Sequence, residues 1–187
     1  MNTSIERLNF GNKRFLLLLI AIFVFPFFAF GQTPADTAQI KKEHSFPEIK
    51  GYVGIVHPLR TWSKDGNTYN FEKFYTFGNP WGINVWKSKK IGFSLEFTPF
   101  IRSDEKGVRM SNFLFHPGLL YRLGREFTLI GRLAYETSGR FGFTPILNKV
   151  VYRNKDYSIF VAGLLPVRYG NVHAPSYTVA FQFGLGF

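Results

Sequence analysis

The sequence of 187 residues contains no cysteine. This absence excludes disulfides, thiolate metal ligands, cysteine nucleophiles and a lipid attached to an N-terminal cysteine. Acidic residues are scarce, because 12 stand against 23 lysines and arginines and leave a net charge of +11. Only one uncharged apolar run approaches the roughly 20 residues that a membrane-spanning helix needs, and it lies near the N-terminus. A bundle of transmembrane helices is therefore excluded.

The apolar run at the N-terminus has the features of a secretory leader. Three basic residues precede an uncharged stretch at 15–30, which ends in small residues. A membrane anchor is the alternative, but Pro26 interrupts the run and a polar stretch follows directly. We predict a signal peptide over 1–31, cleaved before Gln32. An exported protein does not meet nucleic acid, so nucleic acid is not expected as a partner.

Beyond the leader the chain has the pattern of an all-β protein. Turn signals separate segments rich in aromatic and β-branched residues, and no stretch shows a helical period. Short basic turns at 88–90, 123–126 and 153–156 alternate with polar or glycine-rich connections. This alternation predicts eight strands, at 49–59, 74–87, 91–102, 110–122, 127–137, 141–152, 157–167 and 175–187.

Apolar and polar residues alternate along several of these strands. In the last strand the odd positions from Tyr177 to Phe187 are apolar, and the even positions are small or polar. A soluble sandwich also alternates, but its solvent-facing side is charged, whereas the second face here suits a narrow barrel interior. A sheet in hydrocarbon must also close on itself. We therefore predict a closed eight-stranded antiparallel transmembrane β-barrel over 49–187.

The leader, the eight strands and the ending FQFGLGF at 181–187 resemble the small outer-membrane β-barrel proteins of Gram-negative bacteria. The resemblance implies the cell outer membrane as location, with residues 32–48 and the tight turns on the periplasmic side. In that family the barrel-assembly machinery reads a C-terminal aromatic on an alternating last strand. The assembly signal would then consist of Phe183, Leu185 and Phe187. The end of the leader, Phe30 to Gln32, is similar to exported proteins of the Bacteroidota.

Polar residues at inward positions form a candidate network inside the barrel. Its members are Asn84, Glu96, His116, Arg132, Glu136, Asn148 and Gln182. An eight-stranded barrel is just wide enough for side chains to fill it, and buried charges need partners. We therefore interpret Glu96 and Arg132 as a salt bridge in a filled lumen. A narrow ion or solute channel is an alternative, and it requires an incompletely paired lumen.

Histidines and one serine supply the candidate catalytic residues. The spacing of the four histidines matches no zinc motif, and no metal or cofactor is predicted. His57 and His173 are expected at the outer rim beside Ser176, because closure makes the first and last strands neighbours. This set resembles the rim histidine and serine of lipid A deacylases and palmitoyl transferases. The stretch from His173 to Ser176 lacks the deacylase His-x-Ser spacing and an acidic residue, so a lipid-acting enzyme is only the alternative.

Basic residues are expected at both rims of the barrel. Such an arrangement suits the phosphates of outer-membrane lipid and lipopolysaccharide. The outer members are Arg102, Lys106, Arg109, Arg140 and Arg168. The sequence thus predicts a non-enzymatic outer-membrane protein with a structural, envelope-stabilising or surface-binding role.

Prolines support one further alternative, a lateral carrier of a hydrophobic ligand. Proline removes a donor from the hydrogen-bonded ladder, so two prolines facing each other on adjacent strands would weaken the wall. The pairs in question are Pro99 with Pro117 and Pro145 with Pro166. Irregular pairing confined to the rim is the simpler account.

Overall fold

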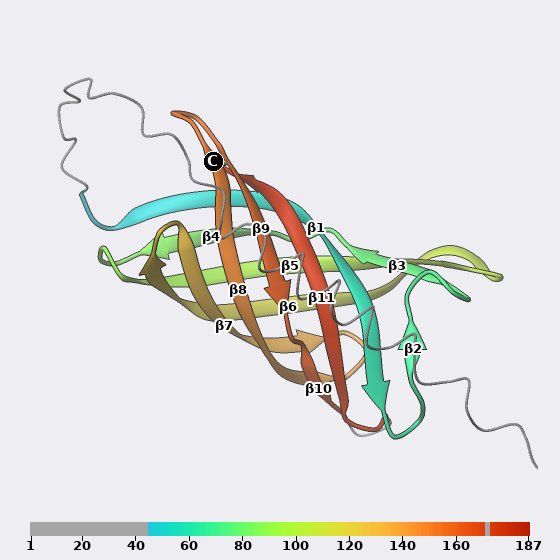
Figure 1. The fold of residues 1–187 in the computed structure, drawn as a ribbon. Coiled ribbons are helices and arrows are strands. Elements are labelled where there is room, and N and C mark those ends of the chain that lie inside the picture. The colour runs from blue at the N-terminus through green and yellow to red at the C-terminus, as the bar shows by residue number, and fades with distance from the viewer. Residues whose placement is uncertain (1–44, 171–172) are drawn as a thin grey trace, which may run out of the picture. The chain divides into compact units, whose positions relative to one another are not determined.

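The computed structural model describes residues 45–170 and 173–187 (Figure 1). The predicted signal peptide, His44 and most of the 32–48 segment lie outside these residues. The described chain is an antiparallel β-sheet, and none of its residues form a helix long and apolar enough to cross a membrane. The strands are β1 (Glu48–Ser63), β2 (Thr68–Tyr69), β3 (Tyr75–Gly78), β4 (Trp81–Trp86), β5 (Ile91–Asp104), β6 (Gly107–Gly124), β7 (Phe127–Glu136), β8 (Phe141–Arg153), β9 (Ser158–Leu164), β10 (Val167–Tyr169) and β11 (Ser176–Gly186).

The strand pairing returns to its starting point. β1 pairs with β11 along its length, and these two strands from opposite ends of the chain run side by side in Figure 1. Two strands of the ring are interrupted: β3 and β4 both lie between β1 and β5, and β9 and β10 both lie between β8 and β11. Prolines mark the breaks, at Pro80 and Pro166. The all-β prediction and the ring of eight strands are confirmed.

Several strands are longer than the sequence suggests. β1 continues to Ser63 beyond the expected end at 59, and β5 and β6 continue to a tight turn between Asp104 and Gly107. In the expected loop at 60–73, β2 pairs with β1. Asn70 follows β2, and its side chain takes the place of main-chain hydrogen bonds between strands. It donates to the Thr76 carbonyl and accepts from the Thr76 amide, both at 2.7 Å.

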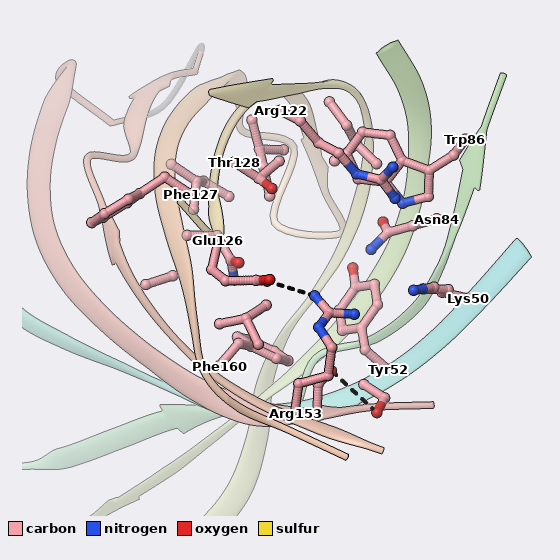
Figure 2. A pocket seen from close by; sticks show the side chains of 18 of the residues that line it. Lys50, Tyr52, Asn84, Trp86, Arg122, Glu126, Phe127, Thr128, Arg153 and Phe160 are labelled. Carbon is pink, nitrogen blue, oxygen red and sulfur yellow. Dashed lines mark hydrogen bonds and ion pairs between the residues drawn. The ribbon is translucent and has the colours of Figure 1, made fainter. Parts of the chain in front are cut away.

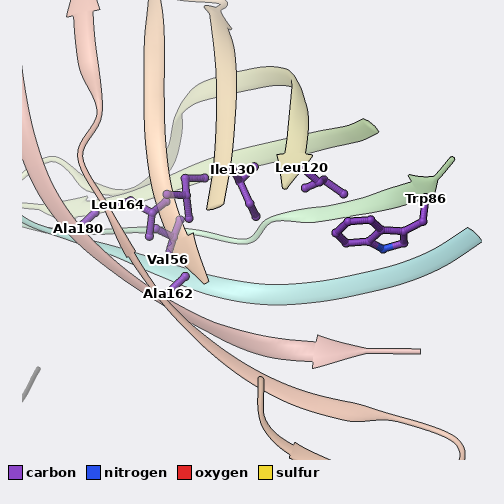
Figure 3. Close-up of a cluster of buried hydrophobic side chains, with 8 residues drawn as sticks. Val56, Trp86, Leu120, Ile130, Ala162, Leu164 and Ala180 are labelled. Carbon is purple, nitrogen blue, oxygen red and sulfur yellow. The ribbon is translucent and has the colours of Figure 1, made fainter. Parts of the chain in front are cut away.

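The apolar core is a diagonal layer on the inside of the ring. Leu120, Ile130, Ile146, Leu164 and Ala180 are successive partners across four strand pairs, so they follow one row around the interior. Figure 3 shows this cluster with Trp86 at one end. Polar rows lie beside it, and they contain the candidate functional residues.

The strand register corrects the proline interpretation. Pro117 lies opposite Leu95 and Pro99 lies opposite Phe113, because the turn after Asp104 sets the pairing of β5 with β6. On the far side of β8 from β7, the Leu165 amide donates to the Pro145 carbonyl at 3.0 Å, so Pro145 faces Leu165 and not Pro166. The prolines of each pair are therefore not partners, so the alternative of a wall weakened by paired prolines loses its basis.

Candidate functional site: the polar interior

A row of residues on four strands places a carboxylate at the centre of the ring. Tyr52 lies opposite Gly82, Gly82 opposite Glu96, and Glu96 opposite His116. Tyr52 Oη donates to Glu96 Oε2 at 2.9 Å, and His116 Nδ1 lies 2.9 Å from Glu96 Oε1. A glycine is needed between them, since a Cβ on residue 82 would stand 2.6 Å from Tyr52 Oη.

The neighbouring row supplies the opposite charge. Arg132 Nη1 donates to Glu96 Oε2 at 2.6 Å, and Nη2 donates to Tyr52 Oη and Ser94 Oγ, both at 2.9 Å. The side chains of Glu96 and Arg132 are each 3% exposed, so the pair is removed from water. Gly118 lies opposite both Ser94 and Arg132 and leaves the space that the arginine occupies. Because both charges are paired and hydrogen-bonded, their desolvation is offset.

The hydrogen bonds continue toward the far end of the ring. His116 Nε2 lies 2.9 Å from Thr144 Oγ1, which accepts from Arg168 Nη1 at 3.0 Å. Arg168 Nε donates to Glu136 Oε1 at 2.6 Å, and Asn112 Nδ2 donates to Glu136 Oε2 at 2.6 Å. One connected network therefore crosses the interior from Tyr52 on β1 to Asn112 on β6.

The network contains some predicted residues and some that sequence reasoning missed. Glu96, His116, Arg132 and Glu136 are members, whereas Asn84, Asn148 and Gln182 line a cavity nearer the short turns. The missed members are Tyr52, Ser94, Asn112, Thr144 and Arg168. Tyr52 was detectable, because it shares the parity of Gly54 and Val56 on β1.

Arg168 does not belong to the outer rim. It is 7% exposed and pairs with Glu136, because the break at Pro166 disturbs the alternation and buries both Val167 and Arg168. Arg140 also differs from expectation, since its Nη2 donates to Ser176 Oγ at 2.7 Å. The lipid head-group assignment of Arg168 is therefore wrong, whereas that of the half-buried Arg140 stays a prediction.

The other three rim residues gather at the tip of the β5–β6 hairpin. Arg109 makes a bidentate contact with Asp104 at 2.6 and 2.7 Å, and Arg102 Nε donates to the same carboxylate at 2.9 Å. The amide of Lys106 donates to Asp104 Oδ1. The hydrogen bonds from Arg109, with those from Arg102 and Lys106, hold the pKa of Asp104 well below its usual range despite an opposing desolvation.

The candidate catalytic residues are not assembled. His57 lies on the outward face, where Nδ1 is 3.2 Å from Tyr75 Oη and the ring stacks on Phe183. Ser176 points inward to Arg140 and lies opposite Ser63, which is about 20 Å along β1 from His57 at about 3.3 Å per residue. The expectation that His57 adjoins Ser176 is wrong, because the two side chains lie on opposite faces of the wall. His173 is exposed in the segment before β11.

A cavity of about 550 Å³ occupies the interior on the side of the short turns (Figure 2). Its inner end includes Tyr52 and Arg132, and its mouth includes Arg122 and Arg153. Figure 2 shows Trp86 and Arg122 packed together; the guanidinium lies 3.7 Å from the ring centroid. This cavity is separate from the outer end of the network around Glu136.

No family model matches the chain, and no curated protein matches it. One similar solved structure is described as a de novo design of transmembrane β-barrels. It is 9% identical in sequence, the match covers 76% of this chain and 97% of that chain, and the TM-score is 0.44. Another is the solution NMR structure of the de novo designed TMB2.3, 13% identical, with 75% and 93% coverage and a TM-score of 0.39.

Proposed function

We propose that this chain is an outer-membrane β-barrel protein with a closed, membrane-spanning wall and a filled lumen. Its role is to stabilise the envelope or to present a binding surface, and it does not form an open pore. The observation that carries the proposal is the buried network from Tyr52 to Asn112, enclosed by a ring whose outward face is apolar. Export by the signal peptide at 1–31 is part of the proposal.

The outward face supports contact with hydrocarbon. Large apolar side chains on five strands are between 41% and 58% exposed, namely Phe93, Leu119, Leu129, Leu133, Phe143 and Phe183. A soluble protein rarely exposes a contiguous apolar surface of this kind. Tyrosines lie nearer both ends of the strands, at 121, 152 and 157 on one side and at 135, 169 and 177 on the other, as in the aromatic girdles of membrane barrels.

The interior supports a closed lumen. Each charged group of the network has an opposite partner, Glu96 with Arg132 and Glu136 with Arg168. A conducting path would require ions to displace these short contacts, which lie away from water. The narrow-channel alternative is therefore not favoured, and a lipid-acting enzyme lacks the assembled His57 and Ser176 that it needs.

Two surfaces of the protein would contact the proposed partners. Phe183 and Leu185 point outward on β11 and Phe187 follows the strand as an exposed aromatic, as the barrel-assembly machinery requires in the family that the sequence resembles. At the opposite end, Arg102, Lys106 and Arg109 gather at a hairpin tip, where phosphates of lipopolysaccharide would lie.

Conductance of the refolded protein in planar bilayers tests the proposal. The chain without residues 1–31 should insert, migrate differently on gels before and after heating, and show no steady current. The double variant Glu96→Ala with Arg132→Ala removes both charges of the central pair and should produce openings. Asp104→Ala, at the hairpin tip, is the control and should remain silent. A steady current through the wild type would overturn the filled lumen, and failure to insert would overturn the membrane assignment.

A further inference from the structure

The cavity on the side of the short turns, here called the vestibule, has features that the filled lumen does not explain. It is bounded by Tyr52 and Arg132 at its inner end, by Trp86 and Phe160 on its sides, and by basic residues at its mouth. Its volume of about 550 Å³ lies within the range of pockets that hold small ligands.

The mouth of the vestibule carries excess positive charge. Four cations, Lys50, Arg122, Arg125 and Arg153, line it together with two carboxylates. Glu48 is shared between Lys50 at 3.0 Å and Arg122 at 3.1 Å, and Glu126 pairs with Arg153 at 2.7 Å. Four cations against two carboxylates leave an excess of positive charge between low-dielectric walls, and such a recess concentrates counter-ions, so the vestibule attracts anions.

Two polar atoms near the inner end are covered by protein and have no partner in the described chain. Arg132 is 4% exposed, yet its Nε donor has no hydrogen-bond partner among the described residues, and the same holds for the Oδ1 acceptor of Asn84. Both residues line the vestibule. They belong to one row, because Asn84 lies opposite Ser94, and Ser94 accepts a hydrogen bond from Arg132. Buried polar atoms are nearly always paired, so this donor and acceptor point to a ligand group.

One kind of chemical group can pair with either atom. A hydroxyl accepts from a donor such as Arg132 Nε and donates to an acceptor such as Asn84 Oδ1. Further amide and hydroxyl side chains line the space between the inner end and the mouth, at Thr128, Asn148 and Gln182. The vestibule therefore combines hydroxyl recognition inside with anion recognition at the mouth.

We propose that the vestibule binds a small hydroxylated organic anion, of the sugar-acid or sugar-phosphate class. The carboxylate or phosphate lies at the mouth beside Lys50 and Arg122, and a hydroxyl lies at the inner end beside the side chains of Arg132 and Asn84. The inference goes beyond the filled-lumen proposal, because a protein can bind such a ligand on one side of the network without conducting it.

Fluorescence of Trp86 reports directly on this site, because Arg122 lies over its indole ring. The variant with Trp62→Phe and Trp81→Phe leaves Trp86 as the single tryptophan. Titration with gluconate or glucose 6-phosphate should give a saturable change that weakens as salt rises. Acetate, which lacks hydroxyls, and glucose, which lacks charge, should each bind at least 10-fold more weakly. The tighter of the two anions distinguishes a carboxylate ligand from a phosphate ligand.

Matched variants locate the binding. Lys50→Gln and Asn84→Ala should each weaken binding of the tighter anion at least 5-fold, whereas Lys155→Gln, on a turn at the same end but outside the vestibule, should not. Heat-dependent gel migration verifies that every variant is folded, which separates a failure of this site from a failure of the barrel. The proposal is overturned if neither anion saturates, if glucose or acetate binds equally well, or if Lys155→Gln weakens binding as much as Lys50→Gln.

Discussion

The guanidinium of Arg132 and the carboxylate of Glu96 meet at 2.6 Å in the middle of the strand ring, each with 3% of its side chain exposed. Removing one member leaves a charge without its partner in a dry interior. Such a loss typically costs about 3–5 kcal/mol, whereas replacing both members by apolar residues is often neutral. The pair therefore allows a test of whether the interior is desolvated.

Glu96→Gln should lower the free energy of unfolding by about 3–5 kcal/mol, because Arg132 then lacks a countercharge. The double variant Glu96→Leu with Arg132→Met should lose markedly less. Urea unfolding in lipid vesicles measures both. Equal losses in the single and double variants would show that the pair is solvated and contributes through contacts alone.

Two neighbouring glycines should respond oppositely to alanine. A Cβ at Gly118 would lie 2.4 Å from the Gly131 carbonyl and 2.5 Å from Arg132 Cγ, so Gly118→Ala should destabilise by about 1–3 kcal/mol. A Cβ at Gly131 would point outward and meet no atom of the described chain within 4 Å, so Gly131→Ala should be neutral or stabilise by about 0.5–1 kcal/mol. The same unfolding experiment compares them. A loss of stability in both variants would contradict the assignment of Gly118 to the inward face of β6 and Gly131 to the outward face of β7.

The alternation on β11 predicts that substitutions at adjacent residues lower the free energy of unfolding by unequal amounts. Phe183→Arg places a charge on the outward face and should cost about 2–4 kcal/mol in a bilayer. Gln182→Ala, on the inward face, should cost less. The unfolding free energies of these variants in vesicles decide the matter, and the reverse order would show that the faces are exchanged.

Asp104 should titrate below the ordinary aspartate pKa of about 3.9. Arg109 favours its charged form, so the folded pKa lies below the unfolded one. The resulting stabilisation of the hairpin tip is present above the unfolded pKa and is lost as pH falls through the folded pKa. NMR titration of the carboxyl group should show the low value, and Arg109→Gln should raise it. An unchanged pKa in that variant would mean that the contact does not persist in solution.

The protein should not remove acyl chains from lipid A or transfer them. Ser176 accepts a hydrogen bond from Arg140, a group that cannot act as a general base. Mass spectrometry of lipid A incubated with the protein in bilayers should show no change above background. A change that Ser176→Ala abolished would establish the acyl-enzyme alternative.

Local alternation and the short turns were enough to predict an all-β ring of eight strands. The parity of β5, β7 and β11 indicated the inward Glu96, Arg132 and Gln182, and the short basic turns separated the strands. The features that the alternation could not indicate arise where the backbone is irregular. The break at Pro166 turns Arg168 inward, and Asn70 replaces main-chain pairing with its side chain.

The face of the wall on which a side chain lies was the second property that the sequence did not predict correctly. His57 was expected to join Ser176 because both strands are neighbours, and they are neighbours. The two side chains nevertheless lie on opposite faces and at different heights. Neighbouring strands bring backbones together, but only register and parity decide which side chains meet.

The membrane-spanning barrel is tested most directly by single cysteines along β11, since the natural sequence has none. Cysteines placed in turn at residues 181, 182, 183 and 184 are labelled with an environment-sensitive fluorophore in vesicles that contain brominated lipids. The account predicts strong quenching at 181 and 183 and weak quenching at 182 and 184. Uniform quenching, or odd positions that report water, would contradict a closed barrel with its apolar face in the bilayer.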